Sequence, residues 1–124
     1  MTQLFSIAAG GAVGALLRYW VSNGVYALLG RGFPYGTLAV NVIGSLAMGL
    51  LYVLFLERMT ASPELRGAVL IGLLGSFTTF STFSIETLNL IEQAEYMKAG
   101  LNMLLSVFAC LIAAWFGLVV GRQI

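Results

Sequence analysis

Charged residues are scarce in this chain, and two ionisable side chains are missing altogether. Only 9% of its 124 residues are charged, and it contains no Asp and no His. The absence of His excludes acid–base and metal chemistry that depends on imidazole. A single cysteine, Cys110, excludes an internal disulfide and any metal site built from several thiolates. The net charge of +1 gives no sign of nucleic-acid binding.

Apolar residues make up most of the chain instead. It is 60% hydrophobic, which is unlike a soluble domain of this size. The apolar runs are long enough to cross a bilayer, which takes roughly twenty residues each. Their approximate ranges are 4–29, 35–56, 65–92 and 97–120. No positive region precedes the first run, as a cleavable signal peptide would require. We therefore expect an all-α membrane protein with a single four-helix transmembrane domain.

The third apolar run contains a stretch that membrane helices rarely carry. From Gly75 to Ser84 the residues are one glycine, three phenylalanines and otherwise only serine and threonine. Hydroxyl side chains compete for backbone hydrogen bonds, and glycine loosens a helix. Non-helical backbone survives at membrane depth only where it is buried in protein or lines a wet cavity. The stretch predicts a break in the third helix near the bilayer midplane, where transporters and channels hold ions.

Three polar side chains interrupt the other apolar positions, and each has two interpretations. Arg18 is either an arginine that extends to the interface or a cation at a vestibule that attracts an anion. Asn41 is either an amide that joins two helices or a donor to an ion. Glu86 is either an interfacial carboxylate or a functional one inside the membrane.

The fourth run carries a polar stripe. Asn102, Ser106 and Cys110 are four residues apart and therefore share one face of a helix. Such a stripe suits a pore lining. It suits a packing face equally well, because small residues lie beside it.

The polar groups suit the binding of a small anion better than catalysis. Neither a pair of carboxylates for acid–base work nor a nucleophile with its base is evident. Phenyl rings have a positive edge, which Phe80 and Phe83 could turn toward an anion. Asn41 and the hydroxyls could replace part of the hydration shell of that anion. Unwound carbonyls at Gly75 and Thr78 could instead hold a cation.

Lysine and arginine are divided almost evenly between the two ends of the four spans. The end with both termini has Arg58, Arg66 and Arg122, and the other has Arg31 and Lys98, with Arg18 if it faces that interface. Because orientation follows these charges, so small a bias predicts insertion in both directions. Two copies could then pair antiparallel and supply the symmetry that one four-helix chain lacks.

Three motifs, in this order, resemble the signature of the Fluc/CrcB fluoride channels. They are Gly10-Gly11-x-x-Gly14-x-x-x-Arg18-Tyr19, Gly36-Thr37-Leu38-x-Val40-Asn41 and Gly75-x-x-Thr78-Thr79-Phe80-Ser81-Thr82-Phe83-Ser84-x-Glu86. The resemblance covers essentially the whole chain. It implies a dual-topology antiparallel homodimer in the lipid of a bacterial inner membrane, with two separate fluoride pores. The implied role is passive export of fluoride, which enters the cell as HF and ionises inside.

The resemblance also implies roles for the motif residues. Phe80 and Phe83 would form an aromatic box whose ring edges line the fluoride path, and Asn41 would donate to fluoride. Backbone carbonyls of Gly75 and Thr78 from both copies would hold one structural sodium ion.

Further polar residues match family positions beside the ion path. They are Arg18 at the aqueous vestibule, Thr82 and Glu86 beside the phenylalanines, Ser81 and Thr37 in a polar relay with Glu86, and Asn102, Ser106 and Cys110 along the fourth helix. Asn102 and Cys110 depart from the residues that the family often has there.

Two other functions suit a chain of this size. A small dual-topology multidrug exporter would need a carboxylate in its first helix, and residues 4–29 contain no Asp or Glu. A membrane assembly subunit that transports nothing would explain the small residues on the helix faces. The residue types alone do not single out fluoride, because rejection of chloride requires a narrow and rigid path.

Overall fold

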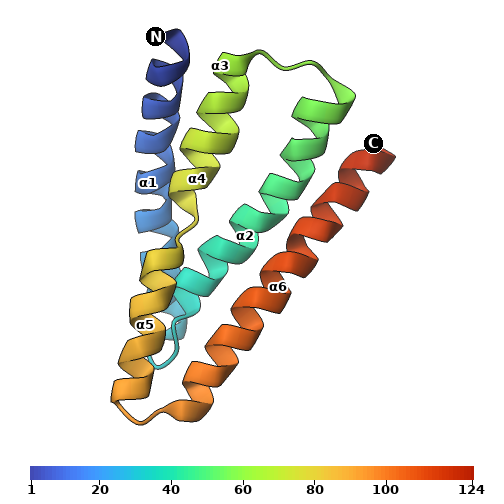
Figure 1. The fold of residues 1–124 in the computed structure, drawn as a ribbon. Coiled ribbons are helices and arrows are strands. Elements are labelled where there is room, and N and C mark those ends of the chain that lie inside the picture. Colours follow the sequence, from blue (N-terminus) through green and yellow to red (C-terminus); the bar gives the residue numbers. More distant parts are fainter.

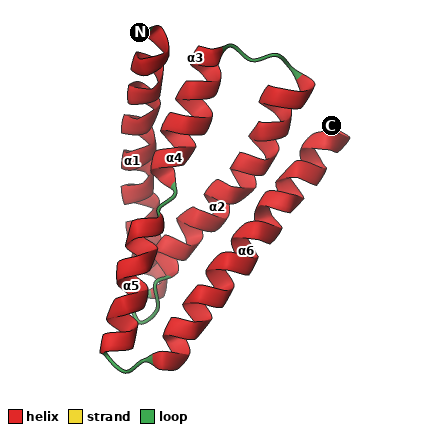
Figure 2. Ribbon diagram, in the orientation of Figure 1, coloured by secondary structure: helices red, strands yellow, loops and turns green.

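The computed structural model describes residues 1–124 and is entirely helical (Figures 1 and 2). The first span is α1, Thr2–Leu29, and the second is α2, Tyr35–Tyr52, continued by η1, Val53–Arg58. The third consists of α3 (Pro63–Arg66), η2 (Gly67–Leu73), α4 (Leu74–Phe77) and α5 (Phe80–Glu92), and the fourth is α6, Tyr96–Gln123. Four helices are thus long and apolar enough to cross a membrane, as the sequence predicts.

Local sequence explains where the spans begin and end. Gly30 ends α1 with a φ of 83°, and its N–H donates to the carbonyl of Tyr26. Ser62 caps α3, because its hydroxyl accepts from the N–H of Leu65 at 3.1 Å. Pro63 follows at the first helical position, where its missing N–H costs nothing. Both termini and the loop before α3 lie at one end of the molecule, as four spans require (Figure 1).

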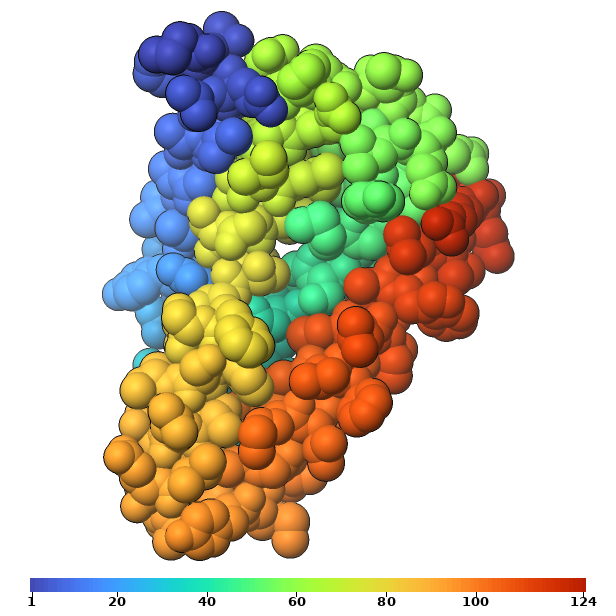
Figure 3. Space-filling view, viewed as in Figure 1, coloured from blue at the N-terminus to red at the C-terminus, as the bar shows by residue number.

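The helices pack mainly as two pairs, α1 against η2 and α4, and α2 against α6. Glycines permit both contacts. A Cβ added at Gly14 would collide with the carbonyl oxygen of Leu73, and one added at Gly49 would collide with that of Ala114. Small residues let membrane helices approach this closely. Between the two pairs the surface is hollowed, next to the yellow residues of the third span (Figure 3).

The break in the third span is much shorter than the stretch from Gly75 to Ser84. Only Thr78 and Thr79 have extended backbones, with φ and ψ of −86° and 158° for Thr78 and −152° and 121° for Thr79. The residues before them belong to α4 and those after them to α5. Gly75 is therefore helical, and the expectation that it is unwound is wrong.

Hydroxyl side chains at and after the break bond back to carbonyls of the same span. Oγ of Ser84 donates to the carbonyl of Phe80 at 2.9 Å, and Oγ1 of Thr78 donates to that of Leu74 at 3.0 Å. Bonds to the carbonyl four residues earlier are compatible with a helix, although they weaken it.

Part of the second and third spans is wider than an α-helix. In η1 and η2 the backbone forms π-helical turns, in which an N–H donates to the carbonyl five residues earlier. The N–H of Leu74, for example, donates to the carbonyl of Val69. No sequence pattern described above predicts these turns.

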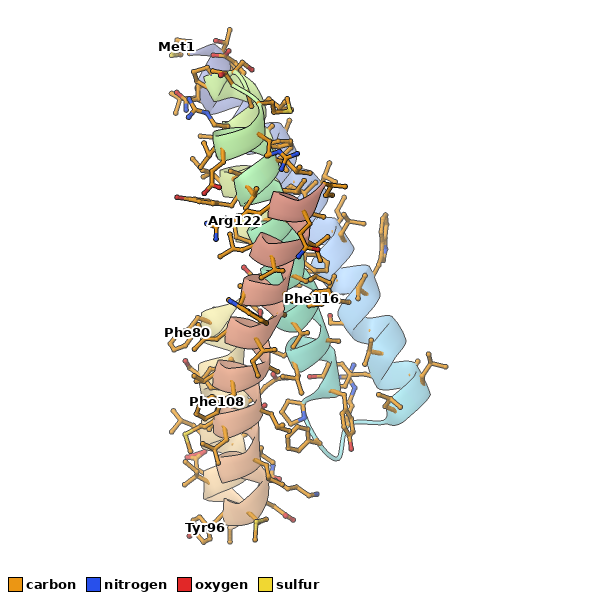
Figure 4. All side chains as sticks on the ribbon, turned by 90° about the vertical axis from the view of Figure 1, so that its right-hand side faces the viewer. Met1, Phe80, Tyr96, Phe108, Phe116 and Arg122 are labelled. Atoms are coloured by element: carbon orange, nitrogen blue, oxygen red, sulfur yellow. The ribbon has the colours of Figure 1, made fainter.

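The single chain leaves most of its apolar side chains uncovered. Only 24 of its 124 residues are buried. Large side chains of α6, such as Leu104, Phe108 and Phe116, are more than half exposed and project from the helix; Figure 4 labels both phenylalanines. Lipid or another protein surface must cover such a face, because its exposure to water is unfavourable. The structure agrees with a multi-pass membrane protein.

Candidate functional site

Asn41 of α2 holds the break in the third span. Its Nδ2 donates to the carbonyl of Thr79 at 3.0 Å, and its Oδ1 accepts from the N–H of Thr79 at 2.7 Å. The amide thus satisfies both backbone groups of a residue that lies outside any helix. Asn41 therefore joins two helices. Its Nδ2 carries a second hydrogen that could still donate to a ligand.

Thr79 is also the N-cap of α5. Its Oγ1 accepts from the N–H of Thr82 at 3.2 Å, lies 3.1 Å from the hydroxyl of Thr82 and lies 3.4 Å from that of Ser81. The first amides of α5 consequently lie at the break, where the helix dipole is positive. The sequence assigns Thr79 no role of its own, although the third motif contains it.

The same bonds free two backbone carbonyls. In an unbroken helix the N–H of Thr79 would donate to the carbonyl of Gly75, but it donates to Asn41 instead. The N–H of Thr82, which would reach the carbonyl of Thr78, donates to Oγ1 of Thr79. Carbonyl oxygens are ligands that hard cations accept. The carbonyl oxygens of Gly75 and Thr78 are therefore suitable ligands for a small cation such as Na⁺. Two oxygens are fewer than the number of ligands that such an ion takes.

Five of the expected pore residues line one cavity of about 460 Å³ between α2, the break and α6. They are Asn41, Phe80, Phe83, Ser106 and Cys110, and Thr78 and Thr79 also contribute to the wall. The structure thus brings together side chains from the second, third and fourth spans. The cavity lies where the surface is hollowed in Figure 3.

The two phenylalanines of this cavity lie against each other. The ring centroids of Phe80 and Phe83 are 5.3 Å apart, and their planes are inclined by 41°. Phe80 is 78% exposed and stands at the edge of the molecule (Figure 4). In a membrane, lipid or another protein surface covers a ring this exposed.

A second cavity, of about 310 Å³, contains the expected vestibule residue. Arg18 lines it together with Thr37, Thr79 and Thr82. Thr82 is therefore on a different cavity from the phenylalanines, and Thr79 borders both. No carboxylate or hydrogen-bond acceptor of this chain pairs with the Arg18 side chain, so its charge is available to an anion.

The polar stripe of α6 is divided between two roles. Asn102 is 1% exposed, and its Nδ2 donates to Oγ1 of Thr87 at 2.9 Å, so it connects α6 to α5. Thr87 in turn donates to the carbonyl of Phe83 at 2.8 Å. Ser106 lies 3.4 Å from Oδ1 of Asn102 and also borders the first cavity, as Cys110 does. Asn102 lines none of the three cavities described here.

Glu86 borders a third cavity, of about 320 Å³, near the loops at residues 30–34 and 93–95. The hydroxyl of Tyr26 donates to its Oε2 at 2.8 Å and lies 3.4 Å from Oγ1 of Thr37. Two members of the expected relay, Glu86 and Thr37, are therefore connected through Tyr26. Ser81 lies near Thr79 instead. No motif in the sequence pointed to Tyr26.

Known proteins similar to this chain identify its family. The family described as "CrcB-like protein, Camphor Resistance (CrcB)" matches residues 5–118. Three relatives carry the name fluoride-specific ion channel FluC. They come from Methylococcus capsulatus (57% identical over 98% of this chain), Magnetococcus marinus (57% over 98%) and Geobacter sulfurreducens (52% over 100%).

The matches cover nearly all of this chain and, for two of the relatives, nearly all of the relative. The chain spans 54% of the length of the Methylococcus protein, but 99% and 100% of the other two. The resemblance inferred from the three motifs is thereby confirmed, since the family match and the relatives extend over nearly the entire chain. This chain is a member of the CrcB family.

Proposed function

We propose that this chain forms a fluoride-selective channel that conducts the ion passively. The observation that carries the proposal is the 460 Å³ cavity, where Asn41, the break and the two phenylalanines meet. The names of the FluC relatives support fluoride as the ion. The protein is accordingly a channel and not an enzyme.

The cavity contains the kinds of groups that an anion needs when it loses water. The second N–H of the Asn41 amide and the first amides of α5 are donors that replace hydration. The rings of Phe80 and Phe83 add positive edges. Because the rings have no net charge, they do not trap the anion as a full positive charge would. Arg18, in the neighbouring cavity, raises the local concentration of anions.

The conducting unit that we propose is a dual-topology, antiparallel homodimer with two pores in a bacterial inner membrane. The exposure of Phe80 supports a partner over the open cavity, and the apolar face of α6 supports burial in lipid or against that partner. The even division of lysine and arginine supports insertion in both directions. Export through such pores would lower the fluoride concentration in the cytoplasm.

One structural sodium ion is part of the same proposal. The carbonyls of Gly75 and Thr78 from two copies would together supply more oxygens than one chain can. A bound cation would offset the negative ends of the two α4 helices where they approach each other. It would therefore stabilise the dimer and would not be transported.

Efflux from proteoliposomes tests the proposal. Vesicles contain the purified protein and potassium fluoride. A potassium ionophore lets potassium leave, so that fluoride can leave without a build-up of charge, and a fluoride electrode records the release. We expect fluoride release that protein-free vesicles lack, and no comparable release of chloride. Exchange of protons for cationic drugs would indicate the multidrug exporter. The absence of any flux from folded protein would indicate an assembly subunit.

A further inference from the structure

The hydroxyl of Tyr26 joins two polar residues that lie on different spans. It donates to Oε2 of Glu86 at 2.8 Å, and the N–H of Thr37 donates to it at 3.4 Å. Tyr26 is only 8% exposed, so water does not replace these partners freely. One phenol on α1 thereby contacts both α2 and α5.

The two hydrogen bonds of the Tyr26 hydroxyl run in one direction, from the N–H of Thr37 to the carboxylate of Glu86. Thr37 is the third residue of α2, so its N–H is one of those that lack a helical acceptor. A tyrosine hydroxyl can accept and donate at the same time. The positive end of α2 is therefore connected through Tyr26 to the carboxylate of Glu86, and bonds in such a series strengthen each other.

Two neighbours hold the ring of Tyr26 in this place. A Cβ added at Gly36 would collide with the ring, so the glycine provides the space that the ring fills. The guanidinium carbon of Arg31 lies 4.4 Å from the ring centroid, a cation–π contact. The hydroxyl is therefore set in position by packing as well as by its hydrogen bonds.

Glu86 has no other partner in the chain. Its Oε1 is buried and makes no hydrogen bond. The cations of the same cavity are engaged elsewhere, since Lys98 lies 3.8 Å from Glu95 and Arg31 stacks on Tyr26. The hydroxyl of Tyr26 is therefore the one group of this chain that hydrogen-bonds this carboxylate.

We propose that Tyr26 is a positioning residue for anion conduction, which acts by holding the carboxylate of Glu86. This inference depends on the proposed function. Glu86 is one helical turn beyond Phe83 on α5, so its negative charge lies close to the proposed path and repels an anion. The phenol anchors Oε2 toward α1 and connects it to the positive end of α2, which reduces that repulsion.

A double-mutant cycle tests the inference in proteoliposomes. We expect Tyr26→Phe to lower fluoride flux about tenfold, the order of change expected when a hydrogen bond to a charged group is lost. The same substitution in a Glu86→Gln background should change flux by less than about twofold, because the charge is no longer there. Tyr96→Phe, which removes a hydroxyl that bonds nothing in the chain, is the matched control and should leave flux unchanged.

Other results would overturn the inference. Wild-type flux in Tyr26→Phe, or equal losses in both backgrounds, would show that Tyr26 does not act through Glu86. If Glu86→Gln conducts too slowly to measure, infrared difference spectra decide. Tyr26→Phe should then shift a carboxylate band in the wild-type background and none in the Glu86→Gln background. A wild-type protein without fluoride flux would instead contradict the proposed function.

Discussion

Asn41 determines the backbone of a residue on another helix. Its amide supplies one donor and one acceptor to Thr79, and no other side-chain type of this size carries both in that arrangement. The interpretation as an amide that joins helices and the interpretation as an ion donor are therefore compatible. The bonds to Thr79 use one hydrogen of Nδ2 and leave the other.

Asn41→Asp tests both roles. The new carboxylate oxygen would face the carbonyl of Thr79, so two acceptors would repel each other, and its charge would repel an anion. We expect a loss of about 1–3 kcal/mol of stability and at least about a tenfold loss of fluoride flux. Thermal unfolding in detergent and electrode efflux measure the two effects.

The control for this substitution is the same chemical change at Asn23. That amide accepts from Arg31 near the loop, and an aspartate would keep the contact. Asn23→Asp should therefore unfold at the wild-type temperature. A stable, fully conducting Asn41→Asp protein would exclude Asn41 from the site.

Phe80→Ile and Phe83→Ile test the contribution of the aromatic rings. An isoleucine fills a similar place but has no positive edge, so each substitution should lower fluoride flux about tenfold while the protein still folds. Phe108→Ile is the matched control, since Phe108 is exposed on α6 and borders no described cavity. Full fluoride flux in both cavity variants would show that conduction does not need the positive ring edges.

At the scale of the elements, glycine contacts determine how closely α1 approaches the third span. The carbonyl of Leu73 lies where a Cβ of Gly14 would stand, and the backbone of Ala68 meets Gly10 in the same way. The wide turns of η2 lie in this contact. The helix α1 thus packs against the part of the third span that precedes the break, although it supplies none of the hydrogen bonds of the break.

Gly14→Ala should therefore destabilise the protein, whereas Gly24→Ala should not. The first substitution forces two backbones apart and should cost about 1–3 kcal/mol. Gly24 lies on the same helix with no atom within 4 Å of an added Cβ, so alanine there should stabilise the helix slightly. Thermal unfolding of the two variants checks this. Equal melting temperatures would mean that the α1–η2 contact relaxes freely.

At the scale of the whole molecule, the cavity of one chain has an open side. It is bordered by Phe80, whose ring is largely exposed, and the apolar side chains of the chain are mostly uncovered. Lipid can cover the outer face of α6. A dehydrated path for an anion, however, needs protein on every side, because lipid offers no donors.

The proposed antiparallel dimer predicts how copies face the membrane. With Cys110→Ser as background, a single cysteine is introduced as Gly32→Cys in one loop or as Thr60→Cys in the opposite loop. An impermeant maleimide applied to one side of the membrane should label about half of the copies of either variant, because half face each way. Complete labelling of one variant and none of the other would exclude dual topology.

Composition and the lengths of the apolar runs are enough to predict the coarse architecture. The length of the apolar runs and the scarcity of charge predicted the four spans, because a bilayer sets a minimum length and excludes unpaired charge. The hydroxyls around Thr78 and Thr79 located the break, because their effect on a helix is local. Asn41, Phe80 and Phe83 could also be identified as candidates from their residue types and their positions in the apolar runs, without knowledge of their neighbours in the fold.

Which residues meet depends on how the helices pack, and this is seen only in the folded chain. The break is limited to Thr78 and Thr79 because Asn41 reaches Thr79 from another span and satisfies its backbone groups. Asn102 is buried because Thr87 lies opposite it, and Tyr26 matters because Glu86 and Thr37 lie around its hydroxyl. Such contacts join residues up to 60 positions apart in the chain. Periodicity and composition describe single helices, and the packing of one helix against another depends on shapes that they do not encode.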